Sequence, residues 1–239
     1  MQSADSAIER AVLPSDEEVK LCVIGLGYVG LPLALAFSRY YPVVGFDIDA
    51  ERIAELRTGI DRTLEATPEE LRASGQLHYT LDPDELAACN VYIVTVPSPI
   101  DLSQQPDLGA IRSASELIAR LLDRGDVVIY ESTVYPGVTE EVCLPLLERS
   151  GLVAGRDFAL GYSPERINPG DKTRKLKDIR KITAGLTPRC AEFVDRLYSR
   201  IIEAGIFRAA SISTAEMAKV VENSQRDVNI ALMNELAIM

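Results

Sequence analysis

A glycine-rich turn between two apolar runs constrains the fold of this 239-residue chain more than any other stretch. The first run, Leu21–Ile24, leads into the turn GLGYVG at residues 25–30, and a small-residue helical pattern follows through Phe37. A second, β-branched run at Val43–Phe46 ends at Asp47. Strand, turn, helix and strand in this order predict a βαβ unit, whose two strands lie parallel in one sheet.

Each glycine of the turn has a separate expected task. Gly25 permits a tight bend, Gly27 lets the backbone approach a pyrophosphate, and Gly30 lets the new helix pack against its strand. The start of that helix directs N–H groups and its positive dipole end toward the bound anion. Asp47 lies 22 positions after Gly25, where a carboxylate can bind the ribose hydroxyls of NAD. The stretch therefore predicts a dinucleotide site.

The acid at Asp47 also favours NAD over NADP. A 2′-phosphate at this position would repel the carboxylate unless an arginine lay nearby. Arg52 follows Asp47 on the next helical segment, and we expect it to brace the adenosine end of the cofactor.

Composition excludes several other classes of protein. A formal net charge of −11 disfavours a nucleic-acid partner. No apolar run reaches membrane-spanning length, and the first 18 residues have no apolar signal-peptide core, so a cytoplasmic protein without a membrane partner is predicted. The four cysteines and one histidine are scattered without ligand spacing, which predicts free thiols and no metal site.

Beyond the turn, strand and helix patterns alternate as far as residue 208. They predict an α/β fold with a doubly wound parallel sheet and right-handed crossovers, a Rossmann-like domain over residues 19–210 that follows a flexible lead-in at 1–18. Further strands are expected at Tyr79–Thr80, Val91–Val96, Val127–Tyr130, Phe158–Gly161, Lys181–Ala184 and Ile206–Arg208. Helices are expected over 50–58, 107–123, 137–148 and 188–203, with further starts at Thr67 and, by its capping-box spacing, at Asp82. Ligands of such sheets bind beyond the carboxyl ends of the strands, so the loops at 97–99, 131–136 and 163–170 should meet at one edge.

The last segment, 211–239, predicts the start of a long connecting helix. Ser213 and Glu216 have capping-box spacing, and neither Pro nor Gly follows. A helix of about 25 residues is ~38 Å long, more than covering a sheet requires, so it should bridge two domains or pair across a homodimer. Its exposed apolar residues would need a partner: Val228, Ile230, Ala231, Leu232, Leu236 and Ile238.

Five ordered blocks resemble the UDP-sugar 6-dehydrogenases: GLGYVGLPLA, TVPSPID, ESTVYPGVTEE, YSPERINPGD and STAEMAKVVENSQRDVNIALMNELA. The SPERINPGD block is most similar to the branch that oxidises UDP-N-acetylglucosamine or UDP-N-acetylgalactosamine. The resemblance implies a four-electron oxidation of a C6 alcohol to a carboxylate with two NAD⁺, through an aldehyde and a cysteine thioester. The products of this family are uronic acids for surface polysaccharides.

The resemblance also implies roles for individual residues. Thr133 would lie beside the nicotinamide and a catalytic water, Glu165 would serve thioester hydrolysis, and Lys219 with Asn223 would stabilise the oxyanion at C6. Cofactor contacts would come from Gly25, Gly27, Tyr28, Val29, Gly30, Asp47, Arg52, Ser98 and Thr133. Substrate contacts would come from Glu165, Arg166, Ile167, Asn168, Lys219 and Asn223.

Independent chemistry supports two of these assignments. Lys219 and Asn223 are four residues apart and share one helix face, where an ammonium and an amide can donate together to a developing alkoxide. A solvated helix face is the alternative. Glu165 lies in a loop expected at the sheet edge, where a carboxylate can activate water.

One feature of the family is missing from the sequence. The family nucleophile is a cysteine in a glycine-rich block of a C-terminal nucleotide-sugar domain, and none of the four cysteines occupies such a block. Because the thioester requires a thiolate, we expect this chain to be an N-terminal fragment that binds NAD without completing the oxidation. UDP-glucose or UDP-N-acetylmannosamine remain alternative substrates. A non-catalytic NAD-binding module is the third alternative, which the presence of Thr133, Glu165, Lys219 and Asn223 disfavours.

Overall fold

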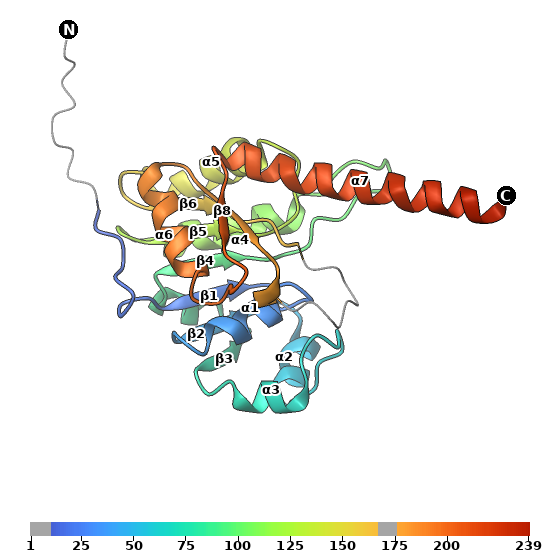
Figure 1. The fold of residues 1–239 in the computed structure, drawn as a ribbon. Helices are drawn as coiled ribbons and strands as arrows, with labels where there is room; N and C mark the ends of the chain where they lie inside the picture. The colour runs from blue at the N-terminus through green and yellow to red at the C-terminus, as the bar shows by residue number, and fades with distance from the viewer. Residues whose placement is uncertain (1–10, 167–175) are drawn as a thin grey trace, which may run out of the picture.

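Eight strands form one sheet in the computed structural model, which describes residues 11–166 and 176–239. Their order across the sheet is β3-β2-β1-β4-β5-β6-β7-β8 (Figure 1). The strands are β1 Leu21–Ile24, β2 Val43–Phe46, β3 Leu77–Thr80, β4 Val91–Val94, β5 Val127–Tyr130, β6 Ala159–Tyr162, β7 Lys181–Gly185 and β8 Ile206–Arg208. The α-helices are α1 Gly30–Phe37, α2 Ala50–Arg57, α3 Pro68–Ala73, α4 Gly109–Leu121, α5 Leu144–Leu147, α6 Pro188–Tyr198 and α7 Ile212–Ile238. Shorter helical turns are η1 Pro83–Ala88, η2 Thr139–Cys143, η3 Glu148–Ser150 and η4 Leu176–Asp178.

Helices cover both faces of the sheet, and this explains the apolar runs of the central strands. Alternate residues of one strand enter different layers: Val23 packs in the layer of α1 and α6, whereas Cys22 packs in the layer of α4. Every residue of β1, β4 and β5 is therefore buried, as is typical of a parallel sheet. The predicted doubly wound fold is confirmed.

The expectation of uniformly parallel strands is wrong at one place. β7 runs antiparallel to β6, with Gly161 opposite Gly185 and Tyr162 opposite Ala184, while β8 is parallel to β7. A parallel pair needs a long crossover, usually helical, and the described part of the β6–β7 connection contains only the short turn η4. As a result, the first residue of β7 lies at the carboxyl edge of the parallel strands.

Two predicted capping boxes are also wrong, whereas the predicted helix start at Thr67 is confirmed. α3 has a complete capping box between Thr67 and Glu70. η1 is a 3₁₀ helix capped by Asp82, and Glu85 instead accepts a hydrogen bond from Thr80 at 2.9 Å. α7 begins one residue after Ser211, whose side chain accepts from the backbone N–H of Thr214.

Residues 11–18, part of the expected lead-in, contact the domain at Arg156 and at residues of and just after α6. The backbone N–H of Ala11 donates to the Arg156 carbonyl at 2.9 Å, and Arg196 donates to the Pro14 carbonyl at 3.0 Å. Asp16 forms ion pairs with Arg196 and Arg200. These contacts fasten the segment to the domain; residues 1–10 lie outside the described residues.

The last helix has two distinct halves. Its first turns pack on the sheet edge, burying Ile212, Ala215, Glu216 and Lys219. Its second half extends away from the domain (Figure 1), and nearly all its side chains are exposed. Over the part of the chain that the structure describes, no helix has the length and apolar character that a membrane span requires.

Asp126 provides a prediction of pH-dependent stability. It is 6% exposed at the start of β5, and burial raises its pKa to about 7. Because the native pKa lies above the unfolded value, Asp126 stabilises the fold least at high pH: stability is lost as the pH rises from about 4 to about 7. We expect Asp126→Asn to increase the free energy of unfolding by about 2 kcal/mol more at pH 8 than at pH 5, measured by urea denaturation. An equal effect at both pH values would contradict this assignment.

Candidate functional site

The loops after β1, β2, β4, β5 and β6 gather at the carboxyl edge of the sheet. Hydrogen bonds join two of them directly: the Ser98 hydroxyl donates to the Thr133 carbonyl, and the Ser132 hydroxyl donates to the Val96 carbonyl at 2.6 Å. The side chain of Thr133 is exposed beside these contacts. The predicted meeting of the loops at 97–99 and 131–136 is therefore confirmed.

The glycine-rich turn has no room for side chains at its two ends. A Cβ on Gly30 would lie 1.8 Å from the Gly25 carbonyl oxygen and 2.5 Å from Oγ1 of Thr95. Thr95 Oγ1 donates to the Gly25 carbonyl at 2.7 Å, which holds the turn against β4. Gly25 itself has φ +95°, in the left-handed region that favours glycine.

The middle of the turn, by contrast, faces open space. A Cβ on Gly27 would meet no described atom within 4 Å. α1 follows directly, and no side chain of the described residues caps its N-terminus at Val29. An open, uncapped helix start behind a glycine fits a pyrophosphate, because the first N–H groups and the helix dipole both favour an anion. Tyr28, half exposed, borders the same opening.

Asp47 closes the site on the side of β2. Its Oδ2 accepts from the Leu26 N–H at 2.7 Å, and its Oδ1 accepts from the Asp49 N–H at 3.0 Å. Each carboxylate oxygen can accept a second hydrogen bond, so the side chain is oriented by the turn and still able to bind ribose hydroxyls. The residues present therefore fit NAD.

Arg52 lies beneath the turn rather than at its surface. The side chain is 3% exposed; its Nε donates to the Leu26 carbonyl at 2.8 Å, and its Nη1 lies 2.7 Å from Oδ1 of Asp61. Arg52 thus supports the turn that would hold the cofactor, and its described contacts are all with protein.

A second group of charged residues lies where α7 crosses the sheet edge. Lys219 is 7% exposed, and no carboxylate among the described residues lies within ion-pair distance of its ammonium. Burial lowers the pKa of Lys219, against the opposing effect of nearby Glu222 and Glu165. Asn223, one helical turn further, is exposed. Glu165 and Glu222 are thus near enough to Lys219 to act on its charge.

Glu165 is itself buried, and its neighbour connects the loop to α7. Oε1 of Glu165 accepts from the Arg166 N–H at 2.5 Å. The Arg166 guanidinium forms a two-point ion pair with Glu222, at 2.9 and 3.2 Å, and also donates to the Arg180 carbonyl. Ile167 and Asn168, which were predicted to contact substrate, lie outside the described residues.

Glu216 joins α7 to the loop that carries Thr133. Its fully buried carboxylate accepts from the backbone N–H groups of Gly137 and Thr139, at 2.6 and 3.0 Å, and from the Thr139 hydroxyl at 2.6 Å. Sequence analysis gave it only a capping role and gave Glu131 and Lys181 none. The sequence does carry one indication of their importance: all three are charged residues inside or beside apolar segments, where a charge needs a partner.

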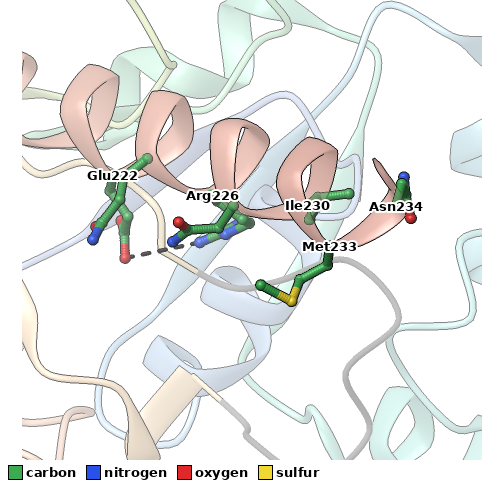
Figure 2. Close-up of a pocket in the computed structure, with 7 residues that line it drawn as sticks. Glu222, Arg226, Ile230, Met233 and Asn234 are labelled. Carbon is green, nitrogen blue, oxygen red and sulfur yellow. Dashed lines mark ion pairs between the residues drawn. The ribbon is translucent and has the colours of Figure 1, made fainter. Parts of the chain in front are cut away.

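A shallow groove continues along α7 from Glu222 (Figure 2). Arg226 lies 3.8 Å from Glu222 across one helical turn, and Ile230, Met233 and Asn234 follow on the same side. The groove therefore extends from Glu222 along the exposed half of the helix. The described residues contain no cluster of His, Cys, Asp or Glu suited to a metal ion.

Comparisons with known proteins agree with this geometry. The family model "UDP-glucose/GDP-mannose dehydrogenase family, NAD binding domain" matches residues 19–202. Similar relatives include the UDP-N-acetyl-D-glucosamine 6-dehydrogenases of Pseudomonas aeruginosa, 58% identical over 93% of this chain, and of Salmonella typhi, 55% identical over 93%. Each match covers 53% of the relative, so the chain spans about half the length of these curated proteins.

Solved structures give the same result. A UDP-N-acetylmannosamine dehydrogenase from Pyrococcus horikoshii superimposes with a TM-score of 0.83 at 38% identity, covering 92% of this chain and 53% of that one. The open glycine turn, the acidic residue at the end of β2 and the sequence match all indicate the same NAD-binding family. The chain belongs to the UDP-glucose/GDP-mannose dehydrogenase family, and residues 19–202 are its NAD-binding domain.

Proposed function

We propose that this chain is the NAD-binding half of a UDP-N-acetylhexosamine 6-dehydrogenase, which oxidises the C6 alcohol of the sugar to a carboxylate with two NAD⁺. The observation that carries the proposal is Lys219, a buried ammonium without a described ion-pair partner, beside Glu165 at the edge where the cofactor loops meet. A protein that only binds NAD has no need for such a cation. The UDP-N-acetyl-D-glucosamine 6-dehydrogenases among its relatives support the choice of sugar.

The cofactor would be held along the open edge. Gly25, Gly27 and Gly30 form the turn, Tyr28 and Val29 border the pyrophosphate, Asp47 binds the ribose, and Arg52 supports the turn from below. Ser98 and Thr133 would face the nicotinamide, which when bound supplies the hydride acceptor. The hydrogen bond from the Ser98 hydroxyl to the Thr133 carbonyl joins these two loops.

The remaining residues would act on the sugar. Lys219 and Asn223 would donate to the oxygen at C6 as it gains negative charge, and burial of Lys219 strengthens this interaction. Glu165 would activate the water that hydrolyses the thioester. Substrate contacts would come from the loop at Arg166–Asn168. The thiolate and the uridine site would come from the second half that the relatives carry, so the chain alone would bind NAD without turnover.

The proposal is tested with the full-length enzyme, meaning this chain together with that second half. Turnover of UDP-N-acetylglucosamine or UDP-N-acetylgalactosamine with two NADH formed per sugar is expected. UDP-N-acetylmannosamine is the second candidate, because of the fold match at a TM-score of 0.83. Activity on UDP-glucose alone would contradict the proposed branch. We propose the cytoplasm as the location, because an enzyme of this class acts where its nucleotide-sugar substrate is available.

Self-association through α7 is part of the same proposal. Val228, Ile230, Leu232 and Leu236 are each at least half exposed on the extended half of the helix. We expect the chain to sediment as a dimer, because exposed apolar side chains along the extended half of a helix favour association. Ile230→Asp should shift it to monomer, whereas Asn229→Asp, the same new charge on a neighbouring polar position, should not. A monomer at all protein concentrations would contradict the prediction.

A further inference from the structure

A buried ion pair lies next to Glu165, and the roles proposed above leave it unused. Lys181 Nζ is 2.6 Å from Oε2 of Glu131 and 3.4 Å from Oε2 of Glu165, and all three side chains are buried. The Tyr198 hydroxyl donates to the other oxygen of Glu131, and Lys181 Nζ lies 5.2 Å from the centre of the Tyr198 ring. One ammonium thus links two carboxylates in the core.

Stability does not account for this arrangement. Moving both partners of an ion pair out of water costs several kcal/mol per ion, and apolar residues of similar volume are often as stable or more stable. Burial raises the pKa of Glu131, against the lowering effect of Lys181, so the fold holds these charges against a desolvation cost. A charge pair kept in the core at such a cost needs another reason.

The topology places the pair at the functional edge. β7 is antiparallel to β6, with Tyr162 opposite Ala184. Continuing that register brings Glu165, three residues after β6, opposite Lys181, the first residue of β7. In a parallel strand the first residue would lie at the opposite edge of the sheet. The reversed strand therefore brings an ammonium to the edge where Glu131 follows β5 and Glu165 lies in the loop after β6.

We propose that Lys181, held by Glu131 and Tyr198, is a positioning residue that fixes the carboxylate of Glu165 for hydrolysis of the thioester. The inference rests on the proposed function, in which Glu165 acts on the thioester. The backbone N–H of Arg166 fixes one oxygen of Glu165, and Lys181 fixes the other. Two anchors orient the carboxylate before substrate arrives, which is how a positioned base gains rate.

The main test is the double variant Glu131→Gln with Lys181→Met in the full-length enzyme. It removes both charges together, keeps the volume of both side chains, and leaves an oxygen for the Tyr198 hydroxyl. We expect kcat to fall about 10- to 100-fold, with the KM for the sugar and the Kd for NAD within about twofold of the parent. The matched control is Lys177→Met, which removes an exposed lysine paired with Glu203 on the surface and should change none of these values.

Repeating the measurement in a Glu165→Gln enzyme distinguishes a role of Lys181 in positioning Glu165 from a purely structural role of Lys181. If Lys181 acts through Glu165, the double variant should lower kcat no further in a Glu165→Gln enzyme. The same 10- to 100-fold loss in that background, or an unchanged kcat in the parent background, would overturn the proposal. If Glu165→Gln alone leaves turnover intact, the proposed role of Glu165 fails instead.

A single variant provides the check if the double variant does not fold. Glu131→Gln keeps Lys181 next to Glu165 and removes only the charge that holds the lysine in place. We expect a smaller loss of kcat, about 3- to 10-fold, which again disappears in the Glu165→Gln background. Equal losses in both backgrounds would overturn the proposal.

Discussion

Replacing Lys219 by methionine is expected to lower kcat of the full-length enzyme about 100- to 1,000-fold. Removal of one donor to a developing oxyanion costs a factor of this size in enzymes that use such stabilisation. Methionine keeps most of the volume of the lysine side chain and removes the charge. The effect should fall on kcat, because the donor acts on the charge that appears during reaction rather than on the bound sugar.

The same variant should not lose stability. Lys219 is a buried cation with a pKa lowered by burial, so its native pKa lies below the unfolded one. Such a group costs no stability at a pH above the pKa of the lysine in the unfolded chain, and it lowers the stability of the fold as the pH falls below that pKa. Methionine removes this cost of burying a charged ammonium. NAD binding to residues 1–239, measured by calorimetry, should be unchanged. Full turnover by the Lys219→Met enzyme would contradict the assignment of an oxyanion role.

The sequence predicted those parts of the fold that depend on local pattern. The βαβ unit around the glycine turn is specified by consecutive residues: an apolar run, a turn with no room for side chains at Gly25 and Gly30, and an acid at Asp47. That Lys219 and Glu165 lie in the same region of the molecule depends on segments far apart in the chain, so the local pattern does not predict it.

Tertiary partners account for what the sequence did not predict. Glu85 and Glu216 stand at capping-box spacing, but they accept hydrogen bonds from Thr80 and from the turn at 137–139 instead of from their own helix starts. The direction of β7 is decided by its connection to β6 and not by its composition. A parallel β7 would place Lys181 at the far edge of the sheet, so its contact with Glu131 and Glu165 could not be found from the pattern.

Replacing Gly27 by valine should abolish NAD binding while leaving the fold intact. A Cβ at this position meets no described atom within 4 Å, and Gly27 is not among the residues with positive φ, so the side chain causes no clash with the protein. It would instead occupy the space in front of α1 that a pyrophosphate requires. We expect the Kd for NAD to rise at least about 100-fold, or ~2.7 kcal/mol, by calorimetry on residues 1–239.

Two other glycines provide the matched comparisons. Gly75→Val places the same side chain in open space at the turn before β3, away from the site, and should leave NAD affinity unchanged. Both valine variants should unfold within about 2 °C of the parent, as exposed substitutions do. Gly30→Ala should lower stability as well as affinity, because its Cβ would lie 1.8 Å from the Gly25 carbonyl oxygen. If the Gly27→Val chain binds NAD as tightly as the parent, the pyrophosphate does not lie over this turn, and the placement of the nicotinamide near Thr133 fails with it.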